Sequence, residues 1–173
     1  TNHHVIDGAK KVAVRNGIGK VTEATVAAIS KDYDLAILEL SNPYPKSYSI
    51  KAKDFVMPKA GDDVISIGYP GIGLTFEQPT ITQGIISKVF DDKMGIFLTT
   101  AAINSGNSGG PLFNLNGKLV GVSFAALDKK KWLDEMGQIP TDMGYAIKSN
   151  MIKEVFKHEK GIPVKSAKFN KAS

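Results

Sequence analysis

A stretch of small and polar residues around Ser108 carries the clearest chemical signal in the sequence. Residues 104–112 read Asn-Ser-Gly-Asn-Ser-Gly-Gly-Pro-Leu. Glycines on both sides of a serine allow a strained turn that directs backbone N–H groups toward the oxyanion formed when the hydroxyl attacks a carbonyl. The N–H groups of Gly106 and Ser108 are placed to donate to it. The stretch therefore predicts a nucleophilic serine, although Ser-Gly-Gly alone also occurs in ordinary hairpin turns.

Two histidines and two aspartates are candidates for the base and the orienting carboxylate that such a serine needs. His3 and His4 are adjacent, and Asp32 and Asp34 precede an apolar segment. A surface histidine pair and ordinary turn aspartates would give the same pattern, so the residue types leave both choices open. Neighbours on an extended strand point to opposite faces, which makes the two histidines poor ligands for one ion. We therefore expect no metal site.

These segments together resemble the HtrA/Deg-type branch of the trypsin-like serine proteases. Residues 1–5 (Thr-Asn-His-His-Val) resemble its Thr-Asn-x-His-Val motif, residues 34–38 its Asp-Leu-Ala-x-Leu segment, and residues 106–111 its Gly-Asn-Ser-Gly-Gly-Pro signature. The order histidine, aspartate, serine is that of the chymotrypsin arrangement. Four further segments carry the resemblance to about Phe156, namely residues 61–70, 82–87, 115–122 and 144–147.

The resemblance implies a catalytic triad of His4, Asp34 and Ser108, with the N–H groups of Gly106 and Ser108 as the oxyanion hole. It implies a serine endopeptidase that needs no cofactor and hydrolyses unfolded or misfolded polypeptides, a role in protein quality control. Its partners would be polypeptide substrates, and the formation of a homo-oligomer stays open. Because an imidazole base must be neutral, we expect activity to rise between roughly pH 6 and 8.

The resemblance also places a primary substrate pocket next to the serine. In the trypsin family the residue six positions before the nucleophile lies at the base of this pocket, and here it is Ala102. No residue of the implied pocket is charged, so a substrate lysine or arginine would be buried without a partner, at a cost of several kcal/mol. Burying an aliphatic side chain gains about 1.5–3 kcal/mol, and Phe124 narrows the space, so we expect small to medium aliphatic residues before the cleaved bond. The implied substrate-binding residues are Ala102, Ile103, Asn104, Ser123, Phe124, Ala125 and Tyr145.

Two other classes of protein compete with this interpretation. Residues 106–110 also fit the Gly-x-Ser-x-Gly elbow of esterases, with Asp142 and His158 following in the required order. That fold needs a helix directly after the serine and alternating strands and helices, whereas turn residues follow Ser108 here. The second rival is a catalytically silent peptide-binding module with the protease fold, in which an incomplete barrel misplaces His4.

The elements that would position these residues are mostly strands. Short segments rich in β-branched and aromatic residues alternate with turn dipeptides, which predicts an all-β protein. The resemblance specifies a chymotrypsin-like double β-barrel in one protease domain of residues 1–163, with halves at 1–53 and 54–148. We expect a helix over residues 149–160 with Ser149 as its N-cap, and a basic tail at 164–173. The expected strands are residues 11–15, 20–29, 35–40, 64–69, 81–90, 96–101, 118–125 and 144–147.

The chain departs from the family pattern at its ends and in one loop. Family members have two strands before the histidine motif and often a PDZ domain after the protease domain. The sequence has no residues for either, so we expect a first barrel that lacks its first strands, or a partner that completes it. Residues 41–53 suggest a linker between the halves. The long segment 127–142 suggests either a regulatory loop beside the pocket or a surface insertion.

Composition fits a globular domain and limits the partners. Hydrophobic residues make up 42% and charged residues 23%, the net charge is +5, and there is no cysteine. The absence of cysteine excludes a thiol nucleophile and disulfides. No stripe of alternating basic and aromatic residues predicts a nucleic-acid partner, and no run reaches the ~18 apolar residues of a membrane span. The location stays open, and the resemblance implies a periplasmic, otherwise extracytoplasmic, or organellar protein.

Overall fold

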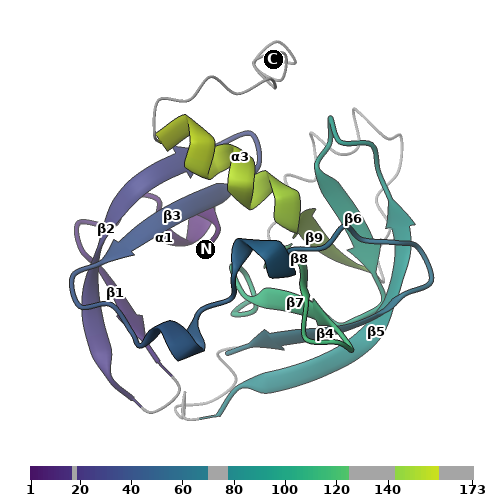
Figure 1. Ribbon diagram of the computed structural model, residues 1–173, viewed down its shortest axis with the longest axis horizontal. Coiled ribbons are helices and arrows are strands. Elements are labelled where there is room, and N and C mark those ends of the chain that lie inside the picture. The colour runs from purple at the N-terminus through teal and green to yellow at the C-terminus, as the bar shows by residue number, and fades with distance from the viewer. Residues whose placement is uncertain (17–18, 70–77, 125–142, 160–173) are drawn as a thin grey trace.

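The first half of the chain folds into an open antiparallel sheet. The computed structural model describes residues 1–16, 19–69, 78–124 and 143–159. A short helix, α1 (His3–Ile6), leads into three strands paired in the order β1-β2-β3 (Figure 1). The first residues of β2 alternate between exposed and buried, as expected of a strand with one face against a core. The strands are β1 (Val12–Arg15), β2 (Val21–Ser30) and β3 (Leu35–Leu40).

The second half closes into a barrel with the strand order β4-β5-β6-β9-β8-β7 (Figure 1). Each strand pair in it is antiparallel. The all-β fold expected from the sequence is therefore confirmed. The antiparallel barrel also excludes the parallel sheet that an esterase elbow requires. The barrel strands are β4 (Asp63–Gly68), β5 (Thr80–Val89), β6 (Ile96–Thr99), β7 (Pro111–Asn114), β8 (Leu119–Phe124) and β9 (Gly144–Lys148).

One of these strands, β7, was not among the expected segments. It has four residues and pairs with both β4 and β8. It follows the glycine-rich turn and begins with Pro111, which has no backbone N–H to donate, so its first residues have the signals of a turn rather than of a strand. The expected linker over residues 41–53 contains two short 3-10 helices, η1 (Lys46–Tyr48) and η2 (Ala52–Asp54).

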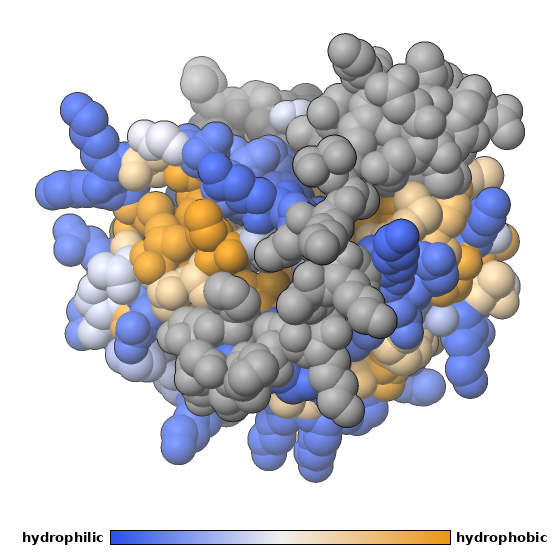
Figure 2. All heavy atoms as spheres, turned by 90° about the horizontal axis from the view of Figure 1, so that it is seen from above, coloured by the Kyte–Doolittle hydropathy of each residue, from blue (hydrophilic) through white to orange (hydrophobic). Residues whose placement is uncertain are grey.

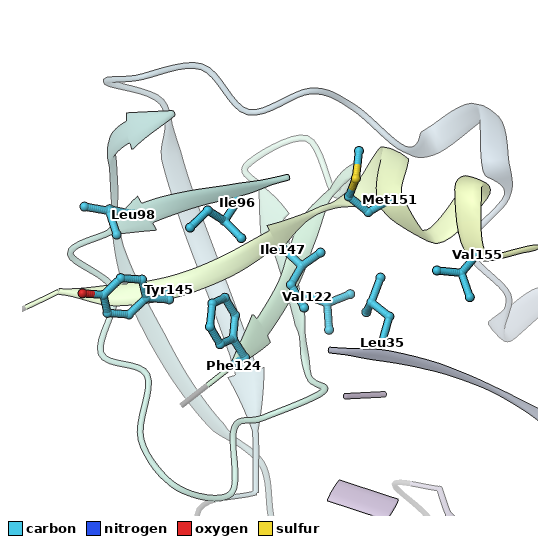
Figure 3. Close-up of a cluster of buried hydrophobic side chains, with 9 residues drawn as sticks. All are labelled: Leu35, Ile96, Leu98, Val122, Phe124, Tyr145, Ile147, Met151 and Val155. Carbon is cyan, nitrogen blue, oxygen red and sulfur yellow. The ribbon is translucent and has the colours of Figure 1, made fainter. Parts of the chain in front are cut away.

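The C-terminal helix α3 (Ser149–Glu159) lies at the junction of the two halves. It contacts β2 and β3 of the sheet and β8 and β9 of the barrel. Met151 and Val155 of the helix share a buried cluster with Leu35 of β3 and Val122 of β8 (Figure 3). Because Leu35 follows Asp34 directly, this cluster holds the start of β3 against the barrel.

The start of α3 differs in detail from the expected one. Ser149 is the first helical residue rather than the N-cap before it. Its hydroxyl donates a hydrogen bond to the carbonyl oxygen of Val56, at 2.9 Å. The serine therefore ties the helix start to the segment before β4. The partner of this hydroxyl is set by a tertiary contact, and helix-capping preferences alone cannot predict it.

The surface of the described residues is mixed in character. Figure 2 shows hydrophilic side chains around smaller apolar areas on one face of the molecule. No helix within the described ranges is long and apolar enough to cross a membrane.

Truncation of the barrel core should destabilise the protein strongly. Leu112 is fully buried, whereas Leu115, three residues later, is 60% exposed. Leu112→Ala removes buried carbon atoms and leaves a cavity, so we expect the free energy of unfolding to fall by about 2–5 kcal/mol. Leu115→Ala makes the same chemical change without a cavity, and its effect should stay within about 0.5 kcal/mol. Denaturant unfolding of both variants measures the difference, and equal losses would contradict this assignment of the core.

Candidate active site

His4 and Asp34 form a two-point contact between α1 and the start of β3. The Nδ1 atom of His4 lies 2.6 Å from Oδ2 of Asp34, and the His4 backbone N–H donates to Oδ1 at 2.8 Å. A carboxylate oxygen accepts, so Nδ1 carries the proton and the neutral ring keeps an unprotonated Nε2. The two side chains are partly exposed, at 35% and 27%. The pair therefore presents an oriented base where a substrate can reach it.

The backbone of Asp34 adopts an unusual conformation. Among the residues that the structure describes, it is the one non-glycine residue with a positive φ, at 51°. Left-handed backbone is uncommon outside glycine, although aspartate tolerates it better than most residues, and such conformations concentrate at functional sites. Asp32, the other candidate, is exposed in the turn before β3. The structure therefore brings Asp34 rather than Asp32 to the histidine.

The two histidines lie on a helix rather than on the extended segment assumed from the sequence. Both belong to α1, and Nε2 of His3 faces Asp7 at 3.9 Å while His4 faces Asp34. The strand argument against a shared metal ion was therefore wrong in its geometry. No group of three potential metal ligands occurs within the described part of the chain.

The turn around Ser108 is held in shape by backbone hydrogen bonds and glycines. Within it, the N–H of Asn107 donates to Asn104 and that of Gly110 donates to Asn107, each at 2.9 Å. Gly106 and Gly109 have φ angles of 97° and 82°, which a residue with a Cβ would adopt only under strain. The turn thus requires the glycines that the sequence pattern singled out.

The serine turn packs directly against the histidine segment. A Cβ atom on Gly109 would overlap the Thr1 hydroxyl and lie 3.1 Å from the backbone nitrogen of Asn2. Gly109 follows Ser108, and Asn2 lies two residues before His4. Segments from distant parts of the sequence therefore meet at Gly109, directly after the half-buried Ser108. The assignment of the triad and of the oxyanion hole to Gly106 and Ser108 stays a prediction that this arrangement supports.

The residues expected at the base of the substrate pocket lie beside the serine turn. The carbonyl oxygen of Ala102 accepts hydrogen bonds from Thr82 Oγ1 at 3.0 Å and from Asn107 Nδ2 at 3.4 Å. Ile103 packs against Gly144, where an added Cβ would collide with it. Asn104 is exposed at the start of the turn.

The expected pocket walls are more buried than their neighbours at the base. Ser123 is fully buried, and its hydroxyl donates to the Asn107 carbonyl oxygen at 2.5 Å. Phe124 and Tyr145 belong to the buried cluster, with ring centroids 5.8 Å apart (Figure 3). Ala125 and the expected loop at 127–142 lie outside the described residues. Their parts in substrate binding stay predictions.

Sequence reasoning gave no role to Asn2, although this residue is central to the geometry. Its side chain is fully buried, and Nδ2 donates to the carbonyl oxygen of Asp34 at 3.0 Å. The signal available in the sequence was a polar residue two positions before the presumed base. Its importance becomes evident only from the hydrogen bond to Asp34 in the structure.

Tyr33, directly before Asp34, should make stability depend on alkaline pH. Burial raises the pKa of Tyr33 to about 12, and the negative charges of Asp32, Glu154 and Asp92 add to the effect. An unfolded tyrosine ionises near pH ~10, so between about pH 10 and 12 the unfolded chain loses a proton that the folded protein keeps. The contribution of neutral Tyr33 is therefore present below pH ~10 and lost as the pH rises toward 12. We expect Tyr33→Phe to flatten the decline of Tm between about pH 10 and 12 relative to the parent. Parallel declines would contradict this assignment.

The sequence of this chain is similar to a protein family and to several characterised proteases. Residues 1–122 match the family described as trypsin-like peptidase domain. The chain is 35% identical over 162 residues to the periplasmic serine endoprotease DegP of Salmonella typhimurium, covering 90% of this chain and 31% of that protein. It is 34% identical over 165 residues to the serine protease Do-like HtrB of Bacillus subtilis, covering 90% and 34%. The chain thus spans about a third of the length of these curated relatives.

Two solved structures share the fold. The serine endoprotease from Yersinia pestis is 31% identical, with a TM-score of 0.71 over 92% of this chain and 52% of that chain. The HtrA-type protease AlgW, solved with a decapeptide, is 28% identical, with a TM-score of 0.71 over 93% and 47%.

Proposed function

Because this chain belongs to the family of trypsin-like peptidase domains, we propose that it is the catalytic part of a serine endopeptidase that cleaves unfolded or misfolded polypeptides. The observation that carries the proposal is the two-point contact of Asp34 with His4, made beside the turn that bears Ser108. Such a base, oriented by a carboxylate and adjacent to a serine between glycines, is what covalent acyl transfer requires. The relatives named as serine endoproteases support the same activity.

The proposed reaction proceeds through an acyl-enzyme. Ser108 Oγ attacks the substrate carbonyl carbon while Nε2 of His4 takes the hydroxyl proton. The N–H groups of Gly106 and Ser108 donate to the oxyanion of the tetrahedral intermediate. His4 then gives the proton to the leaving amine as the C–N bond breaks. A water molecule, deprotonated by His4, attacks the ester, and return of that proton to Ser108 Oγ releases the acid.

Asp34 orients this cycle without exchanging a proton. Its Oδ2 atom keeps the proton of neutral His4 on Nδ1 and stabilises the imidazolium that forms during attack. Its Oδ1 atom accepts from the His4 backbone N–H, which fixes the position of the carboxylate relative to α1. The carboxylate therefore sets both the tautomer and the direction of the base.

Active-site titration tests the proposal against its closest rival. The open first sheet, with three strands among the described residues, is the observation that favours a silent peptide-binding module. A fluorophosphonate probe labels a serine only when the base and the oxyanion donors are in place. We expect stoichiometric labelling of the native protein and none after heat unfolding. Peptide binding without labelling would support the silent module instead.

Specificity should follow from an uncharged pocket. Ala102, Ile103, Phe124 and Tyr145, which we place around the substrate side chain, carry no negative charge that could pair with a cation. Burial of a Val, Leu or Met side chain would gain about 1.5–3 kcal/mol, which predicts cleavage after aliphatic residues. Profiling with a peptide library measures this preference. Dominant cleavage after Lys or Arg would show that the pocket lies elsewhere.

Location and partners are proposed on the same basis. The relatives named DegP are periplasmic, which suggests an extracytoplasmic location for this protein and polypeptides as its substrates. Formation of a homo-oligomer is an open part of the proposal, and analytical ultracentrifugation of the intact protein would measure it.

A further inference from the structure

Asn2 joins the segment of the base to the carboxylate that orients it. Its side chain is fully buried, and Nδ2 donates to the carbonyl oxygen of Asp34 at 3.0 Å. The backbone N–H of His3 donates to the same carbonyl at 3.1 Å. We propose that Asn2 is a positioning residue that holds Asp34 in its left-handed conformation and so aims the carboxylate at His4. This inference rests on the proposed peptidase function.

The geometry shows why the Asp34 backbone needs to be held. Its φ of 51° lies in a region that non-glycine residues enter only when their surroundings impose it. The carboxylate meets two atoms of His4 at once, Nδ1 and the backbone nitrogen. Rotation of the Asp34 peptide toward the β region would carry the carboxylate away from both. A side-chain donor on the Asp34 carbonyl opposes that rotation.

The cost of burying the Asn2 side chain indicates that this residue does not serve stability alone. Its Oδ1 atom is buried and has no hydrogen-bond partner within the described part of the chain. An unpaired buried acceptor is destabilising, whereas an apolar residue of similar size would avoid that penalty. The Asp34 carbonyl would still accept from His3 if the amide were absent. A polar group that is unfavourable for folding is expected where function requires it.

Asn2 also lies against the turn that bears Ser108. Its backbone nitrogen lies close to Gly109, the residue after Ser108. A shift of Asn2 would therefore change the relation of the base to the nucleophile as well as to Asp34. This placement predicts an effect on turnover rather than on substrate binding, since the pocket residues lie on other segments.

The test compares apolar replacements of two asparagines that each have a buried, unpaired Oδ1 atom. Asn2→Leu keeps the number and branching of the side-chain heavy atoms and removes the amide, and Asn150→Leu on α3 is the matched control because Asn150 also has a buried, unpaired Oδ1. For Asn2→Leu we expect kcat to fall about 10–100-fold with KM changed less than about twofold. We expect Tm to change little, because removal of the unpaired acceptor offsets the strain from the larger methyl groups. Asn150→Leu should leave kcat unchanged.

A spectroscopic readout reports the contact without turnover. The low-field proton resonance of the His4 Nδ1–H bonded to Asp34 should be lost or shifted in Asn2→Leu and retained in Asn150→Leu. Parent-like kcat and resonance in a folded Asn2→Leu protein would overturn the inference, as would a fall in Tm with kcat preserved. If Asn2→Leu does not fold, Asn2→Ala serves the same comparison. Failure of the parent protein to react with a fluorophosphonate would instead refute the proposed function itself.

Discussion

Replacement of Ser108 by alanine should abolish covalent labelling by a fluorophosphonate and lower kcat by about 10⁶-fold. Alanine removes the oxygen atom that we propose attacks the substrate, so the proposed base His4 has no hydroxyl proton to accept. Ser108 is half-buried and its turn is held by backbone bonds, so the fold should not depend on the hydroxyl. We therefore expect Tm to stay within about 2 °C of the parent.

Ser105 offers a matched control for this experiment. It lies on the same turn and is exposed. Ser105→Ala should be labelled and should hydrolyse casein at the parent rate. Continued casein hydrolysis by purified Ser108→Ala would refute the assignment of the nucleophile. Loss of labelling in both variants, with Tm retained, would show instead that the turn as a whole was disturbed.

Replacement of Asp34 by asparagine should lower kcat by about 10⁴-fold while the fold is kept. The amide nitrogen of the new side chain would face Nδ1 of His4, which then must accept rather than donate. The ring proton would move to Nε2, the atom that we propose takes the proton of Ser108. Asparagine tolerates the left-handed backbone as well as aspartate does, so the local conformation should survive.

The matched control for Asp34 lies two residues earlier. Asp32 is exposed in the same turn, and Asp32→Asn removes an equal charge without touching His4. Its kcat should remain within about twofold of the parent, because a surface charge contributes little at that distance. Measurements of kcat and KM for both variants decide between the two aspartates. Equal losses would indicate a general charge effect and contradict the specific role of Asp34.

The sequence by itself predicted the features that depend on local pattern. Segments rich in β-branched and aromatic residues between turn dipeptides favour strands, so most strands and the all-β class could be anticipated. The glycines beside Ser108 predicted a strained turn, and Gly106 and Gly109 have the positive φ angles that such a turn uses. The short β7 begins with Pro111 directly after Gly109 and Gly110, and these turn signals are the reason that it was missed.

The resemblance to a protease family predicted which residues form the candidate site. Residue types alone left His3 and His4, and Asp32 and Asp34, as equal choices. Motif matching selected His4 and Asp34, and the structure places these two in contact. No sequence pattern indicated the left-handed backbone of Asp34 or the hydrogen bond from Asn2 that accompanies it.

Only the tertiary structure decided which distant segments meet. Gly109 packs against Thr1 and Asn2, and Leu35 packs against α3, although each pair is far apart along the chain. The same contacts decided that Ser149 bonds to Val56 instead of capping its helix. The spacing of apolar residues along an element predicts which face of the element is buried. It does not predict which other element packs against that face. The orientation of a base by a carboxylate depends on that neighbour to within a few tenths of an ångström, so it arises only when the whole core has packed.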